Sequence, residues 1–199
     1  MKKLIKHLHN VNKHRFLVFI HSIRLGIPFR GLIHDLSKYT LKELVPSTKY
    51  YIGNVTPVYG QRKDNDVYSL LAVTHTHRNK HHYEYWIDIY KNNVVLIMMP
   101  YKYILEYVAD IISASKVYNK KTFTRNFPYE YFYSHSMYSP MHKGTREFIL
   151  RVLSIYSESG FKRLKKRNTK KIYKEIKEKY PLTEIHPIDL NNDVDIKLK

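Results

Sequence analysis

Apolar residues in the first 25 positions recur at spacings of three and four, which is the pattern of an amphipathic helix. The pattern starts near Lys3 and continues to Leu25. The apolar positions that define it are Leu4, Ile5, Leu8, Val11, Leu17, Val18, Ile20 and Ile23. The sequence Gly26-Ile27-Pro28 predicts the end of this helix, because glycine and proline both interrupt helices.

Similar periodicity predicts helices over much of the remaining chain. A short helical stretch at about 29–39 is followed by Thr40 and Glu43, whose spacing is that of a capping box and indicates a new helix start. Further helices are expected at about 66–90, 101–118, 141–159 and 169–180, the last two ended by Gly160 and Pro181.

Three segments lack a clear helical period. Residues 46–66 contain two prolines and two glycines and are expected to be mostly loop. Residues 119–138 are rich in aromatic side chains and are expected to form either a packed loop or a short helix. The tail after Pro181 is expected to lie loose or along the surface. Because the chain contains no convincing run of alternating strands and no internal repeat, the sequence predicts an all-α fold.

The composition predicts a folded protein and restricts its chemistry. The chain has 199 residues, of which 43% are hydrophobic, enough for one domain with a sizeable core. It contains no cysteine, which excludes a disulfide framework, a thiolate metal site and a cysteine nucleophile. Any metal ion must therefore be held by nitrogen and oxygen atoms.

The chain is strongly basic, with 35 lysines and arginines against 17 acidic residues and a formal charge of +18. Such a charge attracts polyanions, so nucleic acids, nucleotides and acidic membrane surfaces are natural partners. The joint abundance of lysine, isoleucine and tyrosine is equally what an AT-rich coding sequence would produce. The densest basic run is residues 162–167, which is either a nucleic-acid or phosphate contact or a solvated helix face.

The N-terminus begins like a secretory signal, but Lys6, His7 and His9 interrupt the apolar stretch that a signal needs. The longest apolar runs, residues 16–20 and 94–100, are far shorter than the roughly 20 residues that span a bilayer. The sequence therefore predicts an intracellular, cytoplasmic protein with no membrane span.

The pair His34-Asp35 offers one neutral nitrogen and one anionic oxygen at the same point, as divalent metal ions prefer. His14 lies twenty residues upstream on the first predicted helix, and His7 and His21 share its stripe at intervals of seven. One or two of these three histidines can point at the pair, and the others are expected to be surface or packing residues.

A second concentration of histidines lies at residues 75–82, which hold four of the twelve. Imidazoles this close tend to stay neutral or to share a metal ion or a phosphate. His77 and His81 have the spacing of a zinc-protease helix, but Arg78 stands where that motif needs its glutamate. The sequence therefore excludes the protease, and it leaves open which of these four histidines bind metal.

Asp110 has apolar neighbours on both sides, which predicts that its carboxylate faces the interior. A buried carboxylate requires a cation, because an unpaired buried charge costs several kcal/mol. Glu106 lies one turn earlier on the same face and is either a hydrogen-bond partner of a ligating histidine or a surface acid.

The ordered set His14, His34-Asp35 and Asp110 resembles the HD-domain superfamily of metal-dependent phosphohydrolases, whose signature is H…HD…D on a helical core. More closely, residues 10–120 resemble a small HD-like family of bacteria and their viruses. The positions that carry this closer resemblance are Arg30-Gly31-Leu32, His34-Asp35-Leu36-Ser37-Lys38, His75, Asn79, His81-His82, Tyr85-Trp86, Met99-Pro100, Glu106 and Asp110.

The resemblance implies an HD-like metal-binding helical domain at residues 1–145. The basic region after about residue 145 has no counterpart in that family. Residues 146–199 are expected to form a basic C-terminal helical extension and tail that packs on the same domain. The protein is expected in the cytoplasm, including that of a virus-infected host cell. The implied ligands of the metal ion are His14, His34, Asp35 and Asp110, with His75 and His82 as further candidates for a second ion. The implied cofactor is one or two divalent ions, of Mn, Fe, Zn, Co, Ni or Mg.

The resemblance implies hydrolysis of a phosphoester in a nucleotide, cyclic nucleotide or nucleic acid by a metal-activated water, and the chemistry of these residues is consistent with it. Asp35, Lys38 and His81 are the expected catalytic residues. Substrate phosphate is expected to bind to Arg30, Lys38, His75, His81 and His82. The alternative is a nonenzymatic nucleic-acid-binding protein that uses its basic surface, especially residues 162–179, on a degenerate HD-like scaffold.

Overall fold

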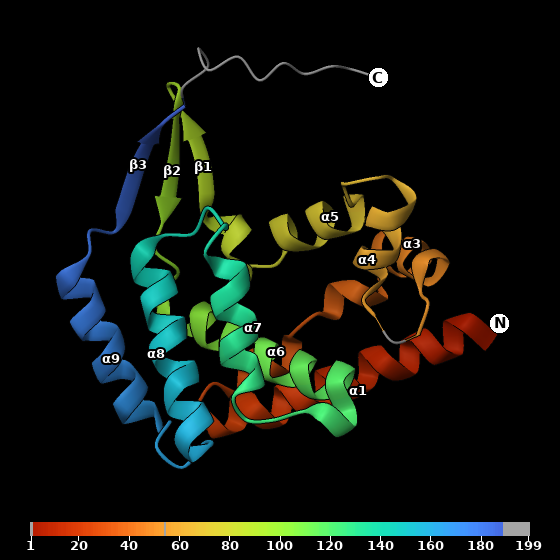
Figure 1. Cartoon of the computed structure of the whole chain (residues 1–199), viewed down its shortest axis with the longest axis horizontal. Coiled ribbons are helices and arrows are strands. Elements are labelled where there is room, and N and C mark those ends of the chain that lie inside the picture. The colour runs from red at the N-terminus through yellow and green to blue at the C-terminus, as the bar shows by residue number, and fades with distance from the viewer. Residues whose placement is uncertain (1, 54, 189–199) are drawn as a thin grey trace.

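The computed structural model describes residues 2–53 and 55–188 and is predominantly helical, with one small sheet (Figure 1). The first half contains α1 (Lys2–Arg24), α2 (Pro28–Ile33), the 3-10 turn η1 (Leu36–Tyr39), α3 (Leu41–Tyr50), α4 (Pro57–Asp64), α5 (Leu70–Arg78) and η2 (Tyr83–Trp86). The second half contains β1 (Ile87–Tyr90), β2 (Asn93–Ile97), α6 (Tyr101–Asn119), η3 (Lys120–Thr122), α7 (Phe127–Ser136), α8 (Lys143–Ser159), α9 (Lys166–Lys179) and β3 (Thr183–Pro187). None of the described helices has the length and apolar character needed to cross a membrane.

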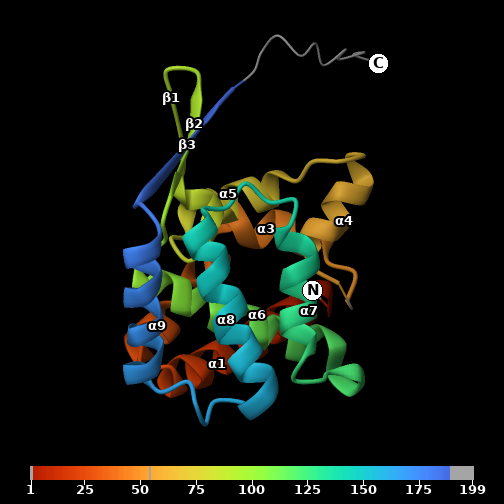
Figure 2. The same cartoon turned by 60° about the vertical axis from the view of Figure 1, so that its left-hand side comes forward.

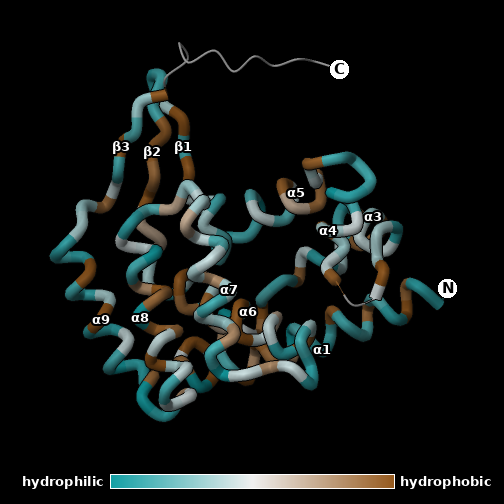
Figure 3. Tube along the Cα trace, viewed as in Figure 1, coloured by the Kyte–Doolittle hydropathy of each residue, from teal (hydrophilic) through white to brown (hydrophobic). Residues whose placement is uncertain are grey.

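The core forms around α6, the most buried helix of the described chain. Val18 of α1, Ile112 of α6, and Phe148 and Val152 of α8 are fully buried in one hydrophobic cluster. Figure 3 shows the hydrophobic positions concentrated on α6 at the centre and on β1 and β2. This core fixes where α6 lies against α1, and two of the candidate metal ligands, His14 and Asp110, project from these two helices.

The C-terminal helices complete the same core. Leu164 precedes α9, and Leu164 and Ile176 are fully buried in the cluster that contains Phe148. The helix α9 lies at the edge of the molecule, beside α8 (Figure 2). The face of α9 opposite its buried residues is basic and exposed. The division expected between residues 145 and 146 falls inside α8, whose core-facing side chains pack with those of α6.

The expectation of an all-α fold is wrong for the sheet, in which three antiparallel strands lie in the order β1-β2-β3. The expected helix at 66–90 is only the shorter α5. Within the tail expected to lie loose or along the surface, residues 183–187 form β3, and residues 189–199 lie outside the described structure. Lys91 and Asn92 both have positive φ, as a two-residue hairpin turn requires. The β-branched residues on either side of this turn favour strands, and β3 completes the sheet from far along the chain.

Other boundaries also differ from the expected ones. The segment 46–66, expected to be mostly loop, contains the end of α3 and all of α4. The helix α4 begins after Thr56, whose side chain accepts a hydrogen bond from the Tyr59 N–H. The helix start at Thr40 is confirmed, but the Thr40 hydroxyl donates to the Ser37 carbonyl and does not cap α3. Of the two options for 119–138, a short helix is present as α7.

The turn between α1 and α2 brings two backbones into close contact at Gly31. A Cβ at this position would lie 2.5 Å from Ser22 Cβ and 2.9 Å from the Phe19 backbone Cα. This close approach positions α2, which ends at the His34-Asp35 pair.

We expect Gly31→Ala to destabilise the protein by about 1–3 kcal/mol, the usual cost of overpacking a tight contact. The α1 backbone cannot move away without disturbing the core around Val18. Urea denaturation followed by circular dichroism measures the change. An unfolding midpoint equal to that of the wild type would contradict this account of the contact.

Candidate metal centre

Side chains from four parts of the chain meet beside the core, between α1, α6, α5 and the turn that follows α2. Most of these side chains are buried or nearly so. The residues are His14 on α1, His34 and Asp35 between α2 and η1, Lys38 on η1, His75 on α5, His81 and His82 after α5, and Glu106 and Asp110 on α6.

The His34-Asp35 pair is held inward by an uncommon backbone conformation. Asp35 has φ 53° and ψ 28°, the left-handed region that aspartate tolerates better than most residues. His34 is 1% exposed and Asp35 is 2% exposed. The short break between α2 and η1 therefore directs both adjacent side chains into the molecule.

A first group of donor atoms forms around Asp110. Its Oδ1 lies 3.0 Å from His14 Nε2 and 3.9 Å from His34 Nε2. His34 Nε2 in turn lies 3.3 Å from Asp35 Oδ2. Atoms of His14, His34 and Asp110 all lie within 4.8 Å of one another, which suits a single ion. The structure thus brings together the four residues expected as ligands.

A second group of donor atoms forms on the other side of Asp35. Asp35 Oδ1 lies 3.3 Å from His75 Nε2 and 3.4 Å from His81 Nε2. Together with His82, these residues also place donor atoms within 4.8 Å of one another. Asp35 therefore directs Oδ2 toward the first group and Oδ1 toward the second group. A carboxylate that binds two ions has this arrangement.

Many of these donor atoms are buried without a hydrogen bond. Within the described residues, no hydrogen bond is formed by Asp35 Oδ1 or by Nε2 of His34, His81 and His82, whereas Asp35 Oδ2 is paired with Lys38 and His14 Nε2 lies 3.0 Å from Asp110 Oδ1. An unsatisfied buried polar atom costs about 1–3 kcal/mol. Nitrogen and oxygen donors in this arrangement fit a divalent ion, and the set suits Zn, Mn, Fe, Co or Ni.

Glu106 contacts the Nδ1 atoms of two of these histidines. Its Oε1 lies 3.1 Å from His34 Nδ1 and 3.4 Å from His81 Nδ1. A carboxylate at Nδ1 keeps the proton on that nitrogen and leaves the Nε2 lone pair free for an ion. Of the two roles considered for Glu106, the structure supports the hydrogen-bond partner and excludes the surface acid.

Arg30 binds Glu106. Its Nε donates to Glu106 Oε2 over 2.7 Å, and its guanidinium lies over the Tyr103 ring. The buried Glu106 carboxylate needs a cation, and Arg30 supplies it. A contact of Arg30 with substrate stays a prediction.

Glu43 is a site residue that the sequence did not reveal. It is 3% exposed, and its Oε2 lies 2.8 Å from His75 Nδ1. It orients His75 as Glu106 orients His34. Its spacing from Thr40 indicated a helix cap, and no other sequence signal marked it as a partner of a histidine.

The charges of the centre reinforce one another. Burial opposes ionisation of Asp35, but His34 and Lys38 hold the pKa of this carboxyl well below its usual range. Burial would lower the pKa of His34, yet Asp35, Glu106 and Asp110 raise it to about 10. A divalent ion would therefore replace the proton that the carboxylates keep on His34.

Lys38 extends from the buried cluster toward solvent. Its Nζ lies 2.6 Å from Asp35 Oδ2, while its side chain is 32% exposed. Burial disfavours the charged amine, but Asp35 and Asp110 raise the pKa of Lys38 above its ordinary value. A permanent positive charge therefore lies where the centre opens.

The remaining candidate histidines lie outside the two donor groups. His7 pairs with Ser47 Oγ, and His21 Nδ1 pairs with Ser113 Oγ over 2.8 Å. Burial and the nearby Lys116 charge lower the pKa of His21 to about 3, so it stays neutral in the packed helix pair. His77 lines an open surface groove with Thr40 and Arg78.

Comparison with protein families places these residues in a defined group. Residues 3–155 match DUF5662, a family of unknown function. The chain belongs to the DUF5662 family. The matched part of this DUF5662 protein contains every residue of the metal centre and ends inside α8. No curated protein and no solved structure matches the chain.

We expect Glu106→Gln to weaken metal binding by about 10- to 100-fold, the usual effect of losing a carboxylate behind a ligating histidine. The amide leaves Arg30 without its anion and no longer holds the proton on His34 Nδ1. Titration of the metal-free protein with Zn²⁺ measures the affinity. Glu158→Gln, an exposed change on α8, is the control. Equal affinity in Glu106→Gln and wild type would contradict this role.

Proposed function

We propose that the DUF5662 protein is a metal-dependent phosphohydrolase or phosphodiesterase of the HD type. The observation that carries the proposal is the shared carboxylate of Asp35, which lies between two groups of orphaned donor atoms and beside the Lys38 ammonium. The order of His14, His34-Asp35 and Asp110 along the chain supports the same reaction class.

A divalent ion in such a donor set lowers the pKa of bound water and polarises a phosphoryl oxygen. The protein side chains supply the remaining steps. Asp35 is ionised, and in the proposal its carboxylate orients the water molecule. Lys38 offers a fixed positive charge to a phosphoryl oxygen, where negative charge increases during the transfer.

In the proposal, the histidines on α5 and after it bind metal rather than substrate. His81 is 1% exposed, and its Nε2 faces both Asp35 and Asp110. In the proposal it acts as a ligand and not as a contact to substrate. His75 is held by Glu43, so it also presents Nε2 toward Asp35.

The competing proposal is a nonenzymatic nucleic-acid-binding protein. Its support is the exposed basic face of α9, which carries Arg167, Lys170, Lys171 and Lys174. This face does not explain why several buried donor atoms around Asp35 have no partner in the described structure. The hydrolase accounts for both observations, since a basic protein also attracts phosphoester substrates.

Metal removal separates the two proposals. We expect the protein as purified to retain a transition metal, and we expect EDTA to abolish hydrolysis of a nucleotide, cyclic-nucleotide or oligonucleotide substrate. Re-addition of Mn²⁺, Fe²⁺, Zn²⁺, Co²⁺, Ni²⁺ or Mg²⁺ one at a time should restore turnover with one or a few ions. Elemental analysis and a substrate panel provide the measurements. Binding of DNA that ignores EDTA but falls steeply with salt, without any turnover, would favour the competing proposal.

A further inference from the structure

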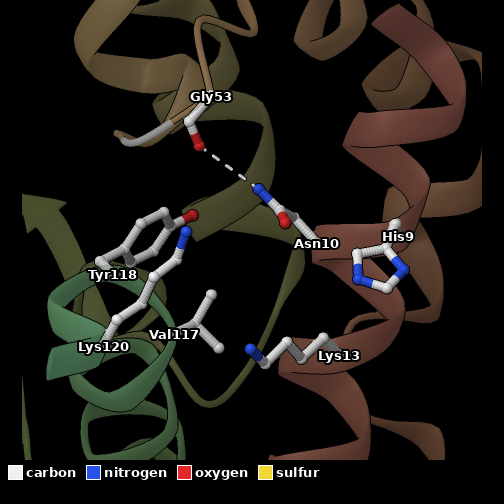
Figure 4. Close-up of a pocket in the computed structure, with 7 residues that line it drawn as sticks. All are labelled: His9, Asn10, Lys13, Gly53, Val117, Tyr118 and Lys120. Atoms are coloured by element: carbon white, nitrogen blue, oxygen red, sulfur yellow. Dashed lines mark hydrogen bonds between the residues drawn. The ribbon is translucent and has the colours of Figure 1, made fainter. Parts of the chain in front are cut away.

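A basic pocket of about 160 Å³ lies between α1, the chain after α3 and the C-terminal end of α6. Lys13 and His9 come from α1, and Tyr118 and Lys120 come from the end of α6 and the residue after it. Figure 4 shows the Lys13 and Lys120 amines directed toward the space beside Val117 and Tyr118. No residue assigned to the metal centre lines this pocket.

Hydrogen bonds fix part of the pocket wall, and two lysines give the pocket its charge. Asn10 donates hydrogen bonds to the Tyr51 hydroxyl and the Gly53 carbonyl, and so ties α1 to the chain after α3. In the part of the chain that the structure describes, neither Lys13 nor Lys120 has an ion-pair partner, and no acidic residue lines the pocket. Two unpaired ammonium groups around a small cavity favour a compact anion.

The pocket and the metal centre share the helices α1 and α6. Lys13 precedes the ligand His14 on α1, and Tyr118 follows the ligand Asp110 by eight residues on α6, roughly 12 Å along the helix axis. The Tyr118 hydroxyl is within electrostatic reach of Lys38 and Asp110. Burial is the main cause that raises the pKa of Tyr118, and these two charges also act on it.

We propose that this pocket is a second phosphate-binding subsite, which holds a phosphate of the substrate other than the one that is cleaved. The inference rests on the proposed hydrolase function. The separation along α6 favours a substrate whose phosphates lie on different parts of the molecule. A nucleoside 3′,5′-bisphosphate and a short single-stranded oligonucleotide both have this chemistry.

The test begins with the full-length protein in EDTA at low salt, titrated with inorganic phosphate and followed by NMR. The variant is Lys13→Gln/Lys120→Gln. The control is Lys63→Gln/Lys102→Gln, which removes the same charge from exposed positions on α4 and at the start of α6. We expect phosphate to bind at least tenfold more weakly to the pocket variant and unchanged to the control. Equal phosphate affinity in the wild type and the pocket variant would overturn the proposal.

Two organic ligands then identify the source of the phosphate. Adenosine 3′,5′-bisphosphate and a thymidine tetranucleotide are compared with AMP for binding to the wild type and both variants. The pocket variant should bind the bisphosphate, the tetranucleotide or both at least tenfold more weakly than the wild type does, while its affinity for AMP changes little. If the affinity for both the bisphosphate and the tetranucleotide is unchanged, the subsite proposal is overturned. Absence of hydrolysis by the metal-loaded wild type, with the binding differences intact, refutes the proposed function alone.

Discussion

Replacing Asp35 by asparagine should give a folded protein that retains no divalent ion and hydrolyses phosphoesters at least about 1000-fold more slowly than the wild type. Asp35 faces both donor groups, with Oδ2 toward His34 and Oδ1 toward His75. The amide keeps the size of the side chain but removes the charge that balances His34 and Lys38. Asparagine also tolerates the positive φ at this position, so the backbone should not be strained.

Elemental analysis after dialysis and turnover with the best substrate of the panel measure the two effects. Asp64→Asn, an exposed change at the end of α4, is the matched control and should keep both metal and activity. Circular dichroism and urea denaturation show whether the Asp35 variant is folded. Wild-type metal content in a folded Asp35→Asn protein would refute the shared-carboxylate account.

The long helices could be predicted from sequence because their burial is periodic over many residues. The apolar periodicity of residues 3–25 and of residues 101–118 predicted two helices, which the structure confirms as α1 and α6. The sheet could not be predicted in this way. Its strands are four or five residues long, and β3 pairs with β2 from about 90 residues further along the chain. A period of two over so few residues carries little information, and no local pattern reports such a distant partner.

The inner part of the candidate site was more predictable than its outer part. A carboxylate among apolar neighbours must meet a cation, and the sequence around Asp110 is sufficient to predict this. Glu43 and Arg30 could not be placed in the same way, because a charged residue on a helix is usually solvated. Only the packing of α3 against α5 brings Glu43 to His75, and only the contact between α2 and α6 pairs Arg30 with Glu106.

Replacing Lys38 by glutamine should lower the rate of hydrolysis without lowering the affinity for the metal ion. We expect this variant to retain its metal but to turn over about 100- to 1000-fold more slowly, the usual effect of losing one charge-stabilising group in an active site. In the metal-free protein the Lys38 ammonium occupies the Oδ2 side of Asp35, where it competes with an ion. Its removal should therefore leave metal affinity equal or higher.

The loss should appear in kcat more than in KM, because Lys38 is proposed to oppose charge that increases only as the phosphoryl group is transferred. Lys63→Gln removes an equivalent exposed charge from α4 and should change neither value. Steady-state kinetics and metal titration together decide the outcome. Loss of the metal would make Lys38 a structural partner of Asp35, and an unchanged kcat would remove it from the reaction.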